Sequence, residues 1–111
     1  MDNIERIEIE GGYGLTYKVI GDSMEPRFVE GDIILLDRTM RAQRNDIVIA
    51  ITGHPPRPVF GRLVIEEGQR FLKFTNPRYP AIEISANELS GVVIEFTDPP
   101  DLDKGQPDAA A

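Results

Sequence analysis

The chain is organised around the stretch Gly21-Asp22-Ser23-Met24-Glu25-Pro26-Arg27-Phe28-Val29-Glu30-Gly31-Asp32. It lies between two apolar segments, 15–20 and 33–37, that predict β-strands. Gly21 allows backbone angles that a side chain would forbid, and the polar residues after it can hydrogen-bond the local backbone. A serine hydroxyl is a weak nucleophile unless a neighbouring base takes its proton. The functional question is therefore whether Ser23 has such a base.

Composition limits the classes of protein that the chain can represent. Its 111 residues suffice for one domain, and 41% hydrophobic with 28% charged residues is typical of a soluble globular protein. The formal net charge of −7 argues against direct nucleic-acid binding by this chain alone. The sequence has no cysteine, no metal-ligand cluster and no stretch of membrane-spanning length. We therefore expect a cytoplasmic protein with no cofactor, no metal and no membrane contact.

Apolar alternation and turn residues predict the rest of the fold. Further strands are expected at 47–51, 59–65, 70–74, 82–84 and 89–96, with a proline-rich loop at 52–58 and a hairpin turn at 66–69. This pattern predicts an all-β domain of bent antiparallel sheets, or a partly open barrel, with a β-hairpin and little helix.

The predicted domain spans residues 14–97. Residues 1–13 contain alternating isoleucines, which suit an edge strand or a flexible arm, and we favour the arm. Residues 98–111 have no apolar pattern and are predicted to form a disordered tail.

Two separated motifs carry a family resemblance. Val19–Pro26 with Glu30-Gly31-Asp32 resembles the nucleophile region of the self-cleaving C-terminal domains of LexA-like and lambdoid phage repressors, which share their serine motif with signal peptidases. Further on, Val59-Phe60-Gly61-Arg62-Leu63 and Asn76–Ile82 follow the phage repressor pattern in order and spacing. The resemblance implies a Ser-Lys peptidase fold with Ser23 as nucleophile and Met24 packed at the site. It also implies a role in transcription regulation or an SOS-type response.

The sequence departs from this family where the general base should lie. In the family a lysine on the strand after the loop activates the serine, but the matching position here is Gly61. Arg62 cannot take its place because a guanidinium group stays protonated. We therefore expect a pseudoenzyme. The alternative is that Lys73, on the partner strand of the hairpin, serves as the base, although the sequence does not fix the strand register.

Other titratable residues give weaker candidates for a base. Lys18 is expected to face solvent, and His54, the only histidine, is expected to be an exposed loop residue. The chain before Ser23 contains neither the Ala-Gly nor the Cys-Gly bond at which family members cut themselves. Few residues precede the motif, so the chain is either the C-terminal part of a longer regulator or a stand-alone protein.

Two functions from different classes follow. The first is a catalytically inactive dimerisation or regulatory module, with a protein partner or an attached DNA-binding domain. The second is a self-cleaving peptidase that uses Lys73. The resemblance implies a homodimer, and the apolar segment Gly91–Phe96, followed by a proline-rich stretch, is expected to form an uncovered edge strand that pairs with its copy.

Overall fold

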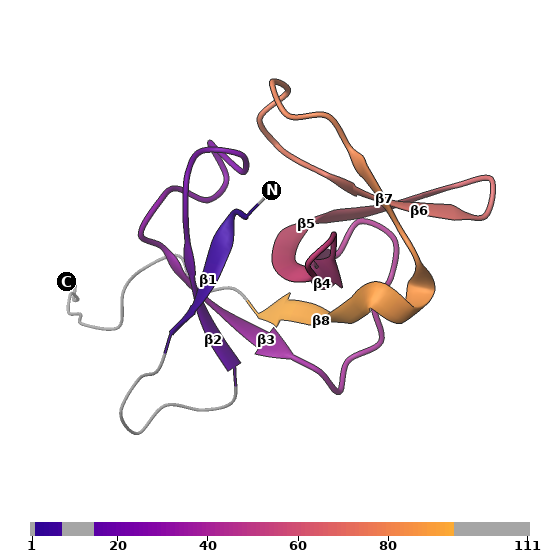
Figure 1. Ribbon diagram of the computed structural model, residues 1–111, viewed down its shortest axis with the longest axis horizontal. Coiled ribbons are helices and arrows are strands. Elements are labelled where there is room, and N and C mark those ends of the chain that lie inside the picture. Colours follow the sequence, from indigo (N-terminus) through magenta and orange to yellow (C-terminus); the bar gives the residue numbers. More distant parts are fainter. Residues whose placement is uncertain (1, 8–14, 95–111) are drawn as a thin grey trace, which may run out of the picture.

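The computed structural model describes residues 2–7 and 15–94. These residues form β1 (Ile4–Ile7), β2 (Leu15–Val19), β3 (Ile33–Asp37), β4 (Ile47–Thr52), β5 (Arg57–Glu66), β6 (Gln69–Lys73), β7 (Ile82–Ile84), the short 3-10 helix η1 (Ala86–Glu88) and β8 (Leu89–Ile94) (Figure 1). Every strand pair is antiparallel, and the sheet is curled like an open barrel. The predicted all-β fold class is therefore confirmed.

One short strand joins the two halves of the sheet. The strand order is β1-β2-β3-β8-β4-β5-β6-β7, and Figure 1 shows β8 lying between the β1–β3 group and the β4–β7 group. Val92 is paired with Asp37 of β3 and also with Val48 of β4. The expectation of an uncovered edge strand is therefore wrong for β8 as a whole, which lies between β3 and β4, although Val93 and Ile94 at its end are paired only with β3. Glu95 and Phe96 lie outside the described residues.

The first residues of the chain are part of the sheet. β1 pairs with β2 along its whole length, and the Ile4 side chain is only 2% exposed. The interpretation of this segment as a flexible arm is therefore wrong for residues 4–7, where the isoleucine alternation marks the edge strand that was the alternative. The remainder of the predicted arm, residues 8–13, and the predicted tail lie outside the described residues.

The hairpin that follows the proline-rich loop has the predicted turn but a longer first strand. Glu67 and Gly68 both have positive φ, 52° and 80°, as a tight two-residue hairpin turn requires. β5 begins at Arg57 and includes Pro58, which was expected in the loop. Strand pairing in this hairpin ends where Arg62 faces Lys73. Beyond that point the edge of β5 is released from β6.

The core fills the inside of the curl. Phe28, from the segment between β2 and β3, meets Phe60 of β5 edge-to-face with the ring centroids 5.3 Å apart. Both rings are fully buried, and Met24 is 1% exposed beside them in the same core cluster. The Ser23 turn is thus anchored by its own apolar neighbours, which hold it against β5.

Candidate functional site

Backbone pairing fixes the segment that carries Ser23. Val19 and Asp32 are bonded across its base, with the Val19 amide donating to the Asp32 carbonyl at 2.9 Å, and the Gly31 amide donates back to the Val19 carbonyl at 2.9 Å. Gly21 has φ 75° and its amide donates to the Glu30 carboxylate at 3.3 Å. The glycine is required because a side chain is strained in this conformation.

Ser23 is buried and bonded to a residue from the start of the chain. Ser23 is only 3% exposed, and Asn3 Nδ2 donates a hydrogen bond to Ser23 Oγ at 2.9 Å. Asn3 is 1% exposed. The same Nδ2 donates to the Phe60 carbonyl at 2.8 Å, and the Phe60 amide donates to Asn3 Oδ1 at 2.9 Å. The Asn3 side chain therefore bonds the backbone amide and carbonyl of Phe60, as a neighbouring strand would, at the part of the β5 edge that is not paired with β6.

This arrangement determines what the serine can do. The Asn3 amide nitrogen has two hydrogen-bond donors and no lone pair for a proton, and its oxygen already accepts from Phe60. Asn3 can therefore hold the Ser23 oxygen in place but cannot remove the hydroxyl proton. Asn3 was missed by the sequence analysis. No signal in the sequence pointed to it, because a polar residue in a charged N-terminal segment is expected on the surface.

Gly61 lies on β5 next to Phe60 and is paired with Val48 of β4. Its backbone is in a region that any residue adopts, so a side chain would not be strained by φ. A Cβ atom there would, however, lie 3.2 Å from the Lys73 carbonyl, 3.3 Å from Phe74 Cε1 and 3.4 Å from Leu72 Cβ. The local packing is therefore adapted to glycine and would have to yield by a few tenths of an ångström.

Lys73 is the residue that was considered as a substitute base. It is exposed and pairs with Arg62 across the hairpin, whereas a side chain at position 61 would contact Leu72 and Phe74. Because side chains alternate along a strand, Lys73 lies on the face opposite to that contact. The partner of Ser23 Oγ is Asn3, and the structure does not bring Lys73 to it. Arg62 is engaged elsewhere, donating to Asn45 Oδ1 at 2.8 Å.

The other sequence candidates lie apart from the serine. Lys18 is exposed on β2, opposite Glu5 of β1. His54 is exposed in the turn between β4 and β5. Met24 is buried, and its sulfur accepts a hydrogen bond from Thr75 Oγ1 at 3.8 Å. The structure thus brings Met24 and Gly61 to the region of Ser23 and leaves Lys18, His54 and Lys73 on the surface.

The loop after β6 covers the other side of the serine turn. The Asn76 amide donates to the Ser23 carbonyl at 3.0 Å, and Asn76 Nδ2 donates to the Asp22 carbonyl at 3.0 Å. The Tyr79 hydroxyl donates to the Asp22 carboxylate, and this bond raises the pKa of Tyr79 above its ordinary value of 10.0. The two motifs that carry the family resemblance are thus in direct contact.

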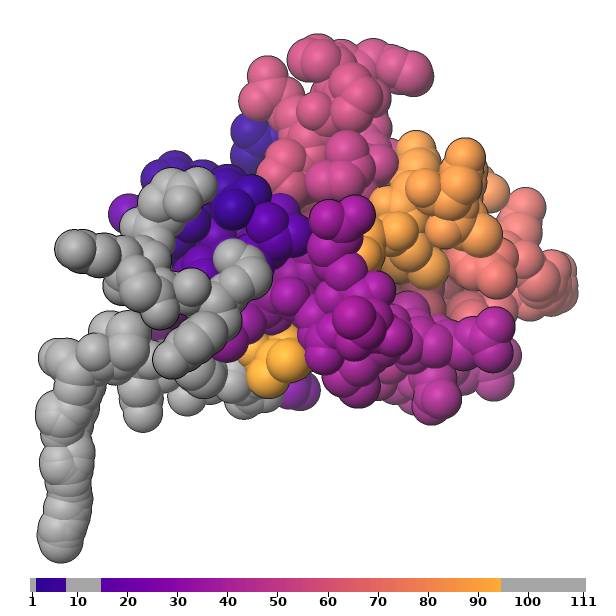
Figure 2. Space-filling model, turned by 90° about the horizontal axis from the view of Figure 1, so that it is seen from below, coloured from indigo at the N-terminus to yellow at the C-terminus, as the bar shows by residue number. Residues whose placement is uncertain are grey.

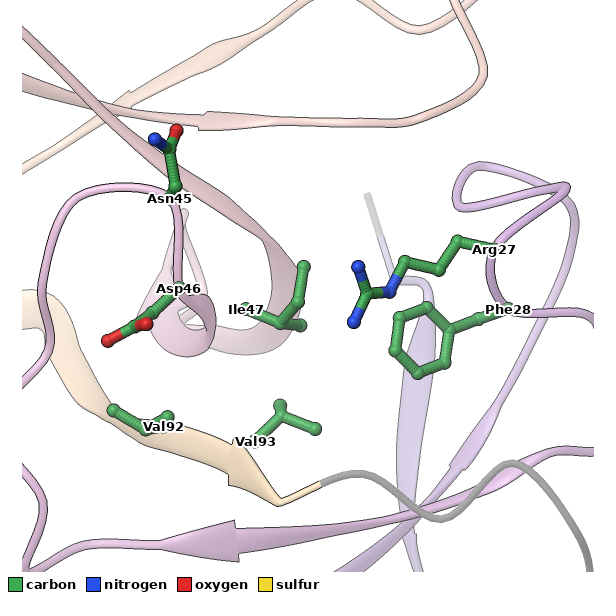
Figure 3. A pocket seen from close by; sticks show the side chains of 7 residues that line it. All are labelled: Arg27, Phe28, Asn45, Asp46, Ile47, Val92 and Val93. Carbon is green, nitrogen blue, oxygen red and sulfur yellow. The ribbon is translucent and has the colours of Figure 1, made fainter.

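A separate pocket of about 200 Å³ opens where β8 crosses between the halves of the sheet. Figure 3 shows the Arg27 side chain reaching into it beside the Phe28 ring, with Val92 and Val93 on the opposite wall. Its one carboxylate, Asp46, accepts from the Gln43 amide at 2.8 Å and so stabilises a turn. The only carboxylate of this pocket is therefore already engaged in holding the backbone.

Among residues 2–7 and 15–94, no group of three His, Cys, Asp or Glu side chains could hold a metal ion. Within the same ranges, no helix is long and apolar enough to cross a membrane.

A curled β-sheet that buries a Gly-Asp-Ser-Met turn against the Asn-Pro-Arg-Tyr-Pro loop defines the class: a LexA-like, phage repressor-type domain. The family comparison agrees, since the model of the Peptidase S24-like family matches residues 5–94. The chain belongs to the Peptidase S24-like family.

The relatives found by sequence comparison are regulators. The chain is 38% identical over 82 residues to Repressor protein C2 of Salmonella phage P22, a match covering 69% of this chain and 38% of that protein. It is 39% identical over 85 residues to Prophage repressor CohE of Escherichia coli (72% of this chain, 38% of the relative). It is 37% identical over 90 residues to the HTH-type transcriptional regulator for conjugative element SXT of Vibrio cholerae (76% and 41%). The matched part thus spans about two-fifths of the length of these relatives.

Proposed function

We propose that this domain is a catalytically inactive regulatory module of a transcriptional regulator, in which Ser23 keeps the nucleophile position without a general base. The observation that carries the proposal is the hydrogen bond from Asn3 Nδ2 to Ser23 Oγ at 2.9 Å, beside a glycine at the position of the family lysine. A serine activated for attack needs an acceptor for its proton, and an amide nitrogen is not one.

The names of the relatives support the regulatory role. Two are repressors of phage or prophage and others are HTH-type regulators, each longer than the matched part of this chain. In this proposal the domain works beside a DNA-binding domain or a protein partner. The nucleic-acid contact would be made by that partner, since this acidic chain carries a net charge of −7.

The test is the reactivity of Ser23. The wild-type chain should show no self-cleavage and no labelling by a serine-directed acylating reagent above the level of Ser23→Ala. Incubation between about pH 8 and pH 9.5, where a lysine amine near the serine would begin to lose its proton, should leave the mass unchanged. Labelling at the rate of an active serine peptidase would overturn the proposal. If Lys73→Met then abolished that labelling, the self-cleaving alternative with Lys73 as base would be correct.

A gain-of-function variant sharpens the same test. Gly61→Lys should place an amine on the face of β5 that meets Phe74 and should raise the labelling of Ser23 above wild type. Gly61→Met has similar bulk and no amine, so it controls for the displaced packing. Both variants should lose about 1–3 kcal/mol of unfolding free energy through overpacking. Labelling in the methionine variant equal to that in the lysine variant would exclude a base effect.

We infer in addition that the domain forms a homodimer, as the family resemblance implies. In the structure Ile94, at the end of β8, is 43% exposed and offers apolar surface for such a contact. Ile94→Arg tests this better than a change at Val93, because Val93 pairs with Leu36 inside the sheet. Sedimentation at micromolar concentration should show a dimer for wild type and a monomer for Ile94→Arg. A wild-type monomer would contradict the inference.

A further inference from the structure

The charge of the chain is distributed unevenly between its segments. Residues 95–111 contain five acidic residues and one lysine, a net charge of −4, and residues 8–14 contribute −2. These two segments therefore account for most of the net charge of −7 and leave −1 for the residues that the structure describes. The described part of the domain is nearly neutral, so its cationic groups are free to form a local positive surface.

Such a surface lies where the connection after β3, the β5–β6 hairpin and the start of β8 meet. A groove of about 460 Å³, here called the arginine groove, is lined by the cations Arg38, Arg41 and Arg70 and by the apolar side chains Leu63, Ile65 and Leu89, and it contains no acidic residue. Figure 2 shows the connection after β3 (purple) lying beside the residues of η1 and β8 (orange) and of the hairpin (salmon). The groove thus combines an apolar lining with three positive charges.

The three guanidinium groups are not used by the fold. Among residues 2–7 and 15–94, none of them forms a hydrogen bond or an ion pair. Two arginines that do not line the groove are engaged: Arg57 pairs with Asp2 at 2.9 Å, and Arg62 donates to Asn45 Oδ1 at 2.8 Å. Arg70 is half-buried, and its guanidinium group has no ion-pair partner among the described residues. An anionic group that entered the groove would therefore gain contacts without breaking existing ones.

The sequence after β8 has the matching chemistry. It contains Asp101-Leu102-Asp103, an apolar residue between two carboxylates, preceded by Pro99-Pro100. Gly91 lines the groove and Ile94 ends β8 three residues later. The eight residues 95–102 that follow Ile94 can span up to about 28 Å, enough to return along a strand of this length. The length of the segment therefore allows it to reach the groove. Its carboxylates and its leucine match the charge and the apolar lining of the groove.

We propose that the arginine groove is a docking site for Asp101-Leu102-Asp103 of the same chain. Leu102 contacts the apolar lining formed by Met40, which is 50% exposed, and by the half-buried Ile65 and Leu89, and the two flanking carboxylates pair with the unpaired guanidinium groups. This function is independent of Ser23 and of its reactivity. It gives the regulator a charged surface that its own acidic segment occupies.

The experiment uses the full chain, which has no cysteine, so that Gly105→Cys provides a single site for a spin label. Paramagnetic broadening of backbone amides then reports which surface the label approaches. The expected result is loss of the amide signals of Arg38, Arg41 and Gly91 at low salt, with those of the His54 turn unchanged. Signals should return in Asp101→Asn/Asp103→Asn and at about 0.5 M salt, which screens exposed charges.

Matched variants separate a specific site from general attraction. Arg41→Glu should abolish the broadening, whereas Arg44→Glu, an exposed arginine of the same connection that does not line the groove, should leave it in place. Leu102→Ser should weaken it, because the apolar contact is lost. Equal broadening over the whole surface would overturn the proposal. So would broadening that appears only when spin-labelled chains are mixed with unlabelled isotope-enriched chains, because it would then come from a second copy.

Discussion

The serine site and the arginine groove are two polar regions of one small sheet, and they differ in whether their polar side chains have hydrogen-bond partners. At the serine site Asn3 is 1% exposed and uses its carbonyl oxygen and its amide nitrogen in bonds to Phe60 and Ser23. At the groove, the guanidinium groups of Arg38, Arg41 and Arg70 have no hydrogen-bond or ion-pair partner within the part of the chain that the structure describes.

The difference follows from burial. A buried polar group that lacks a partner costs roughly 1–3 kcal/mol, so a buried site must be saturated, whereas an exposed charge can rely on water. The serine site is therefore part of the fold, and its chemistry cannot be altered without loss of stability. The groove contributes little to the fold, and its charges remain available for a ligand.

The largest expected effect is from Asn3→Ala, which should lower the free energy of unfolding by about 2–4 kcal/mol. The change leaves the buried amide and carbonyl of Phe60 without partners and opens a gap beside Ser23. Urea denaturation measures the loss. Asp2→Ala is the matched control, since it breaks only an ion pair whose side chains are 42% and 53% exposed and should cost less than about 1 kcal/mol. Equal losses would mean that Asn3 does not close the sheet.

An intermediate effect is expected at the clamp between Tyr79 and Asp22. The pKa of Tyr79 is raised by its hydrogen bond to Asp22, so its stabilising contribution is complete below about pH 10 and is lost as the pH rises through the folded-state value. Tyr79→Phe should therefore be less stable than wild type at pH 8, and the difference should shrink above pH 10. A difference that stays constant to about pH 11.5 would show that the hydroxyl does not form this bond.

Much of the fold could be predicted from local sequence. The strands at Ile33–Asp37 and Ile82–Ile84 and the Glu67-Gly68 turn were placed because apolar runs and turn residues are local properties. Pairing between distant strands is not local. The apolar run at the end of the fold, β8, was expected at an edge, yet it lies between β3 and β4, and no property of the run itself distinguishes the two positions.

The candidate site was predicted in part for the same reason. Ser23, Met24 and Gly61 were located by motif, whereas the register that places Lys73 opposite Arg62 was not fixed by the sequence. Asn3 was missed because its hydrogen-bond partners, Ser23 and Phe60, lie 20 and 57 residues further along the sequence. Its side chain, and not a strand backbone, bonds the backbone of Phe60. A polar residue in a charged N-terminal segment is expected on the surface, and only the curl of the sheet brings this one inside.

The smallest effect is predicted for the groove. Arg41→Gln should change the free energy of unfolding by less than about 0.5 kcal/mol, since an exposed charge away from buried contacts contributes little to stability. The same substitution at Arg44, on the same connection but outside the groove, should be equally mild. The two variants should nevertheless differ in the spin-label experiment, where only the change at Arg41 removes a groove contact. A loss above about 1.5 kcal/mol for Arg41→Gln would mean that its guanidinium supports the fold. The contrast between a serine site whose polar groups are all hydrogen-bonded and a groove whose guanidinium groups have no partner would then no longer hold.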